Sequence, residues 1–236
     1  MTTDVKVWRT MPVELLLEGR LAVCLGACVE VAYKVDRLVG ARAVVRVIED
    51  GAVMPSIEEH ARAGAITIER RAPRAEDVRG AAIVYVSPER EALGAMLAAA
   101  AREEGRLVCT LDRPHAATFV NPAVAGDGPL RLAIASGGRS PALVRRVREG
   151  LSRALSSPRL AAFVEKVAAL RAAAPREERA SRGRESVVGF EVDLVVRYPA
   201  WFPAYDAIAE PAGGDLRSAQ HNEPGDAPGD TSSGGS

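Results

Sequence analysis

A glycine turn is the first place in this sequence where the residue types suggest chemistry. Gly26 ends an apolar run, and Cys28 and Val31 stand where the dinucleotide-binding pattern G-x-G-x-x-G/A has its second and third small residues. Only the first glycine is present, so nucleotide binding and an ordinary strand-to-helix turn are both open interpretations. If a dinucleotide binds, its pyrophosphate is expected at the start of the following helix, beside Cys28, Val29 and Glu30.

The second half of that pattern is an acidic residue that binds the ribose hydroxyls. It is expected about 20 positions after the first glycine, at the end of the second strand. Glu49 and Asp50 stand 23 and 24 positions after Gly26, directly after the apolar Ile48. The spacing therefore favours a ribose site at Ile48 and Glu49.

A second stretch combines glycines, an arginine and a helix start. A serine before a proline is typical of a helix N-terminus, with the serine as cap and the proline in the first turn. Two adjacent glycines allow backbone amides to face an anion, and an arginine can bind a carboxylate through two hydrogen bonds. Anion binding and plain helix capping are compatible here. The stretch consists of Ser136, Gly137, Gly138, Arg139, Ser140 and Pro141.

An aspartate at the end of a strand is a third candidate. Asp112 follows the apolar run that ends at Leu111 and precedes Pro114, so it suits either a general base or a turn. His115 could be a second base or a metal ligand, but a solitary loop histidine is more often solvated.

The three cysteines are less informative. Cys24, Cys28 and Cys109 could converge at one sheet edge as a thiolate or iron site, whereas Cys24 on a strand is better interpreted as a small buried hydrophobe.

The elements that must position these residues alternate between strands and helices. Such alternation, with almost continuously apolar strands, is typical of a parallel sheet covered on both faces. The fold class is therefore α/β, with a doubly wound, mostly parallel, Rossmann-like sheet. The expected strands are 21–25, 43–48, 65–68, 81–86, 107–111 and 130–135, and the expected helices are 29–39, 57–63 and 89–102.

Beyond residue 139 the pattern becomes helical. Helices are predicted over 140–155 and 159–173, each with an apolar stripe that it cannot bury alone, which favours a small dimerising region. We expect three domains: 1–139, Rossmann-like and nucleotide-binding; 140–174, helical, for dimerisation and substrate; and 175–236. The last comprises a charged linker, an aromatic segment with a predicted strand over 187–198, and a disordered tail after residue 206.

Composition excludes several classes of protein. The 31 Lys and Arg residues balance 31 Asp and Glu, so the net charge gives no reason to expect a nucleic-acid partner. Three cysteines are not a secreted disulfide framework, and the longest apolar run is about half of a membrane span. We therefore expect a cytoplasmic protein with no signal peptide and no membrane partner.

Several stretches together resemble one family. Residues 12–20 resemble its lead-in to the first strand, residues 107–112 resemble its central aspartate loop, and residues 135–143 resemble its Ser-Gly-Gly-x-Ser-Pro stretch. The family is precorrin-2 dehydrogenase/sirohydrochlorin ferrochelatase, also found as the N-terminal module of siroheme synthase. The resemblance extends from about residue 12 to residue 173.

The resemblance implies an enzyme of siroheme biosynthesis that acts as a homodimer. Members oxidise precorrin-2 to sirohydrochlorin with NAD, and then insert ferrous iron, a substrate, to give siroheme. Asp112 matches the catalytic aspartate of both reactions. Because the tetrapyrrole is ringed with carboxylates, residues 136–140 are expected to bind substrate, with Arg139 pairing with one carboxylate. No resident metal site is assigned.

The nucleotide region departs from the family pattern. The family has three glycines at 26–28, an Arg-Lys pair at 33–34 and Thr-Asp-Asp at 87–89, where this chain has Gly-Ala-Cys, Tyr-Lys and Ser-Pro-Glu. Two alternatives therefore stay open: a chelatase without the dehydrogenase, and a tetrapyrrole-binding homologue without turnover.

Overall fold

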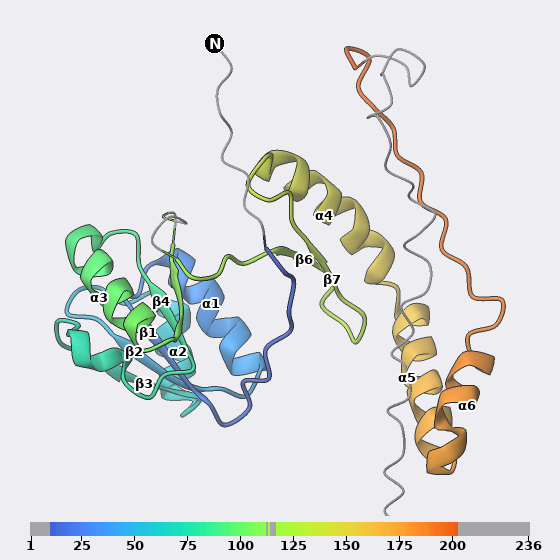
Figure 1. Ribbon diagram of the computed structural model, residues 1–236, viewed down its shortest axis with the longest axis horizontal. Helices are drawn as coiled ribbons and strands as arrows, with labels where there is room; N and C mark the ends of the chain where they lie inside the picture. Colours follow the sequence, from blue (N-terminus) through green and yellow to red (C-terminus); the bar gives the residue numbers. More distant parts are fainter. Residues whose placement is uncertain (1–9, 112, 114–116, 203–236) are drawn as a thin grey trace, which may run out of the picture. The chain divides into compact units, whose positions relative to one another are not determined.

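The computed structural model describes residues 10–111, 113 and 117–202, which fall into two units, 1–186 and 187–236. The first unit begins with a parallel sheet in the strand order β3-β2-β1-β4-β5 (Figure 1). Leu25 of β1 lies between Ile48 of β2 and Val86 of β4, and Val86 pairs with Thr110 of β5. The strands are β1 (Leu21–Leu25), β2 (Val44–Ile48), β3 (Ile66–Glu69), β4 (Ile83–Val86) and β5 (Leu107–Thr110).

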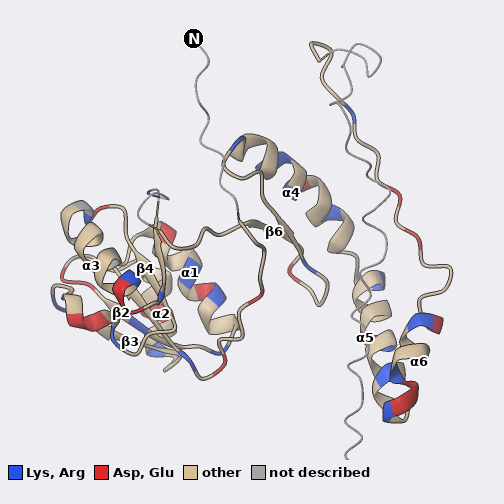
Figure 2. Cartoon of the chain, viewed as in Figure 1, with Lys and Arg blue, Asp and Glu red and all other residues tan. Residues whose placement is uncertain are grey.

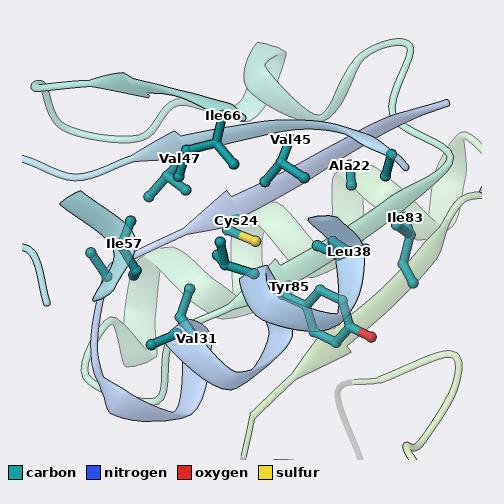
Figure 3. Packing of buried hydrophobic residues seen from close by; sticks show 14 of the residues in the cluster. Ala22, Cys24, Val31, Leu38, Val45, Val47, Ile57, Ile66, Ile83 and Tyr85 are labelled. Atoms are coloured by element: carbon teal, nitrogen blue, oxygen red, sulfur yellow. The ribbon is translucent and has the colours of Figure 1, made fainter. Parts of the chain in front are cut away.

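Helices cover both faces of this sheet, as the continuous apolar strands require. Helices α1 (Val29–Gly40) and α2 (Pro55–Arg62) pack with Cys24, Val47 and Tyr85 on one face (Figure 3). Helix α3 (Glu91–Glu103) and the 3-10 helix η1 (Ala75–Val78) cover the other face. Successive strand residues alternate between these two cores, because strand side chains alternate faces. The predicted doubly wound, mostly parallel fold is confirmed.

A smaller group of elements follows β5. Strands β6 (Ala123–Ala125) and β7 (Leu132–Ile134) form a separate antiparallel pair, and helix α4 (Pro141–Leu155) packs against both. Helix α5 (Pro158–Ala173) packs against α6 (Arg179–Glu185), with a short 3-10 helix η3 (Arg176–Glu178) between them. Charged residues are spread along α4 and α6 (Figure 2).

Three expectations differ from the structure. The strand expected at 130–135 is β7, which pairs with the unpredicted β6 and does not join the parallel sheet. The charged segment after residue 174, expected to be a linker, is largely helical from 176 to 185, where Arg182 forms an ion pair with Glu185 at 3.3 Å. A charged sequence is compatible with helix where one face packs on a neighbour.

The strand predicted over 187–198 is wrong. The described residues 187–202 of the second unit form no strand, and Val192, Leu194 and Val196 are exposed. Alternating apolar residues become a strand only when a neighbouring strand accepts their backbone hydrogen bonds.

The predicted disordered tail after 206 lies outside the described residues. Among the described helices, none is long and apolar enough to cross a membrane.

Candidate nucleotide-binding site

The glycine turn after β1 is held by its neighbours on both sides. The Gly26 amide donates to the Ile48 carbonyl at 2.9 Å, and the Ser87 amide donates to the Leu25 carbonyl at 2.8 Å. Gly26 has a φ of 109°, and a Cβ there would come within 2.3 Å of the Ser87 Cβ. This position therefore requires glycine for both its backbone conformation and its close contact with the loop after β4.

The start of α1 is the part of the turn where a phosphate is expected. Cys28 is the N-cap residue, and its side chain makes no capping hydrogen bond to the first turn. Instead its Sγ accepts a hydrogen bond from Ser87 Oγ at 3.2 Å. Val29 is exposed, and hydrogen bonding to Cys28 lowers the pKa of Glu30 below its ordinary value. Cys28 thus makes no cap to the amides of the first turn, where the Glu30 amide donates to the Glu30 carboxylate.

The acidic residue predicted to bind ribose is at this edge, but it already has a cationic partner. Glu49 is buried, and its Oε1 accepts a hydrogen bond from the Gly51 amide at 2.7 Å. The same oxygen forms an ion pair with Nη2 of Arg90, which also contacts Asp50 Oδ1. The Arg90 hydrogen bond holds the pKa of Asp50 below its usual range. The predicted juxtaposition of Ile48 and Glu49 with Gly26 is present in the structure.

The candidate catalytic residue, Asp112, lies outside the described residues, as does His115. Leu111, the last described residue before position 112, is in a turn that follows β5. The Thr110 hydroxyl donates to the Arg113 carbonyl at 2.6 Å, and the Leu111 amide donates to the Val86 carbonyl at 3.0 Å. This turn is at the same edge of the sheet as Gly26, since β4 and β5 are parallel neighbours.

A partly buried cluster of side chains lies at that edge on the α1 face. The Tyr85 hydroxyl donates to Asn121 Oδ1 at 2.9 Å, and the Asn121 amide donates to Cys109 Sγ at 3.4 Å. Lys34 lies 5.9 Å from the centre of the Tyr85 ring, and burial lowers the pKa of its amine. Phe119 meets the same ring edge to face at 5.7 Å. The cluster fixes the loop after β5 to the sheet.

The Ser-Gly-Gly-Arg-Ser stretch is a helix-capping structure. The Ser140 hydroxyl accepts a hydrogen bond from the Leu143 amide at 3.3 Å, and the Ser140 amide donates to Ser136 Oγ at 3.1 Å. Gly137 and Gly138 both have positive φ. Arg139 is exposed and donates to the Ser136 carbonyl at 3.4 Å. Capping is therefore confirmed, and this stretch belongs to the β7–α4 connection rather than to the glycine turn.

The cysteines do not form a metal site in the described structure. Burial raises the pKa of Cys24 to about 12, as expected of a thiol packed as a small hydrophobe. No group of three or more His, Cys, Asp and Glu side chains within residues 10–111, 113 and 117–202 is arranged to hold a metal ion.

Comparison with known proteins identifies similar sequences and a family model that covers the glycine turn. A family model described as putative NAD(P)-binding matches residues 14–123. The siroheme synthase of Hahella chejuensis is 26% identical over 151 residues, which are 64% of this chain and 32% of that protein. That of Ectopseudomonas mendocina is 32% identical over 139 residues, 58% of this chain and 29% of that protein. The chain therefore spans about a third of the length of these relatives.

A solved structure gives the same fold. The chain titled "SirC, precorrin-2 dehydrogenase" superposes with a TM-score of 0.65 at 19% identity, and the match covers 77% of this chain and 90% of that one. Fold and strand order define a Rossmann-like domain, and residues 14–123 of it are similar to the putative NAD(P)-binding family model. The predicted resemblance to the family that includes the N-terminal module of siroheme synthase is confirmed by these siroheme synthases.

Arg90 is the residue of this site that sequence reasoning missed. No local pattern in the sequence indicates this contact, because Arg90 lies 40 positions after Asp50, the nearer of its two carboxylate partners. The family pattern compared at this loop ends at Glu89, one residue before it. Only the strand order, with β1 between β2 and β4, brings the loop after β4 close to the end of β2.

Proposed function

We propose that this chain catalyses the NAD-dependent oxidation of precorrin-2 to sirohydrochlorin, a step of siroheme biosynthesis. The observation that carries the proposal is the hydrogen bond from the Gly26 amide to the carbonyl of Ile48, the residue before Glu49, at the carboxyl edge of a parallel sheet. This edge, beside the first strand, is where doubly wound proteins bind dinucleotides. Similarity to siroheme synthases supplies the substrate class.

The chain offers a fitting set of groups for the dinucleotide. The amides of Cys28, Val29 and Glu30 would face the pyrophosphate, and Ile48 and Glu49 would contact the adenosine ribose. The fit rests on two observations: the first turn of α1 has no side-chain cap from Cys28, and Glu49 is held in place by the Gly51 amide. NAD, when bound, supplies a hydride acceptor.

The proton released in this oxidation needs a base, and Asp112 is the proposed one. The described residues beside that position, Thr110 and Arg113, are joined by a hydrogen bond from the Thr110 hydroxyl to the Arg113 carbonyl at 2.6 Å. A carboxylate at a strand end beside the nucleotide edge can accept a proton from a substrate bound across it.

The tetrapyrrole carries carboxylates, and we propose that residues 136–140 bind some of them. Arg139 is exposed just before α4, and Gly137 and Gly138 add no side chain beside it. A guanidinium and the positive end of a helix both favour carboxylates.

We propose a homodimer that forms through α4 and α5. Neither helix has a buried residue, and Leu143, Val147 and Leu170 are exposed along them. Amphipathic helices in soluble proteins need a partner for such stripes. In this proposal residues 1–139 bind nucleotide, and residues 140–174 dimerise and contact substrate.

Iron insertion into sirohydrochlorin is the second proposed activity, with ferrous iron as a substrate and Asp112 as the base that removes pyrrole protons. Its support is the matching aspartate loop alone. A chelatase without the dehydrogenase, or a tetrapyrrole-binding protein without turnover, is the alternative that the experiments below separate.

The decisive assay mixes purified protein with precorrin-2 and NAD in the absence of metal. We expect NADH to appear in a fixed ratio to sirohydrochlorin. Both products are monitored by their absorbance. If precorrin-2 stays intact and no NADH forms, the dehydrogenase proposal is wrong, and iron insertion into supplied sirohydrochlorin decides between the two alternatives.

Asp112→Ala tests the assigned base. We expect it to slow both reactions by at least about a hundredfold, the range of a lost general base. Asp127→Ala is the matched control, because Asp127 is exposed in the β6–β7 turn. Wild-type rates in Asp112→Ala would contradict the assignment.

A further inference from the structure

The ion pair between Arg90 and Glu49 crosses the end of β1. Glu49 follows β2 and Arg90 lies in the loop after β4, while β1 is the strand between them. At the carboxyl ends, Leu25 pairs with both Ile48 and Val86, so Gly26 lies between the two loops that the ion pair joins. The Arg90 guanidinium is therefore held across the turn that would bind the pyrophosphate.

The two carboxylate partners of Arg90 differ in how easily they release it. Both ion pairs use a single nitrogen, Nη2. Glu49 keeps its hydrogen bond from the Gly51 amide after Arg90 leaves, so its buried carboxylate is not left without a donor. The Asp50 side chain is 47% exposed and can be hydrated instead. Releasing Arg90 has a cost at Glu49, whose buried carboxylate loses its counter-ion and keeps only the Gly51 amide, and little cost at Asp50.

The negative charges around the glycine turn would oppose phosphate binding unless a cation were close to the phosphates. Cys28 stands at the position of the second glycine, whose absence of a side chain lets the backbone approach the pyrophosphate. Glu30 adds a negative charge in the first turn of α1. With Glu49, Asp50 and Arg90 carrying a net charge of −1, bound phosphates would gain little electrostatic attraction unless a guanidinium turned toward them.

We propose that Arg90 is a phosphate-binding residue of the nucleotide site, which exchanges Glu49 and Asp50 for a phosphate group of the incoming dinucleotide. The proposal rests on the proposed nucleotide function and adds to it a specific cation outside the glycine turn. A guanidinium binds phosphate through two parallel hydrogen bonds, and its position across Gly26 favours the pyrophosphate. A 2′-phosphate on the adenosine ribose, beside Glu49, is the other source of the same chemistry.

Arg90→Gln is the test variant, and binding of NAD and of NADP is measured by calorimetry without substrate. We expect NAD affinity to fall by about tenfold or more, the effect of losing a hydrogen bond to a charged group. Arg42→Gln is the matched control, because it removes an exposed arginine–glutamate pair, with Glu18, before β2. We expect its affinities to equal those of the wild type. Thermal unfolding of both variants shows that they are folded.

The two nucleotides distinguish the two phosphates. Equal losses for NAD and NADP assign Arg90 to the pyrophosphate, and a loss confined to NADP assigns it to the 2′-phosphate. Unchanged or tighter binding of both nucleotides overturns the proposal, because Arg90 would then only hold or block the site. If the wild type binds neither nucleotide, the proposed function itself fails, which separates that failure from a failure of the Arg90 assignment.

Discussion

The parallel-sheet lobe (β1–β5 with α1–α3) and the helical lobe (β6, β7 and α4–α6) bury their side chains to very different degrees. Four of the five residues of β1 and all four of β4 are buried, whereas α4 and α5 have no buried residue. The sheet lobe therefore has a complete core of its own. The helical lobe leaves apolar side chains for a partner, which is why we propose dimerisation there and nucleotide binding in the sheet lobe.

The largest expected effect comes from replacing one leucine in each lobe. Leu97 on α3 is fully buried, and Leu143 on α4 is 59% exposed. Leu97→Ala should lower the free energy of unfolding by about 2–5 kcal/mol, the cost of a core cavity. Leu143→Ala should cost under about 1 kcal/mol, measured by urea unfolding.

Leu143→Ala should instead weaken self-association, measured by sedimentation over a range of concentrations. A Leu143→Ala protein as unstable as Leu97→Ala, with unchanged self-association, would show that α4 packs in a core of its own chain.

Gly26→Ala tests whether the glycine turn depends on glycine at this position. We expect the free energy of unfolding to fall by about 2 kcal/mol or more. Positive φ costs an L residue about 1–2 kcal/mol, and the contact with Ser87 adds to that cost. NAD affinity should fall with it. Gly19→Ala is the control, because Gly19 has a positive φ but nothing within 4 Å of an added Cβ. The free energy of unfolding should fall less in Gly19→Ala than in Gly26→Ala, and its NAD affinity should be unchanged. If both variants lose the same free energy of unfolding, the contact with Ser87 does not explain the effect at Gly26.

The smallest expected effect concerns the caps of the two exposed helices. The Ser140 side chain caps α4, whereas Ser157 at the start of α5 makes no such hydrogen bond. Ser140→Ala should cost about 1 kcal/mol, and Ser157→Ala should change stability by less than about 0.5 kcal/mol, both from urea unfolding. The reverse order would mean that α4 does not depend on its cap.

The sheet lobe was largely predictable from sequence, and the helical lobe much less. Buried parallel strands such as residues 83–86 are continuous apolar runs, which leave a clear signal. Strand β6 has only three residues, and α6 is made mostly of charged residues, so neither leaves a periodic pattern. The wrong strand at 187–198 had the right pattern but no partner strand in the described structure.

The candidate site was predictable only where a motif lies in one continuous stretch. Gly26, Glu49 and the Ser140 cap follow from local spacing. The Arg90 contact depends on strand order, which places β1 between the two loops. No local pattern in the sequence specifies that order.

The central claim is that the altered turn at residues 26–28 is a working nucleotide site. Amide hydrogen exchange of the full chain, with and without saturating NAD, tests it most directly. We predict slower exchange at residues 25–30 and 48–51, with no change in the β6–β7 turn at 126–131. Unchanged exchange at 25–30, or protection confined to residues 136–140, would contradict the account.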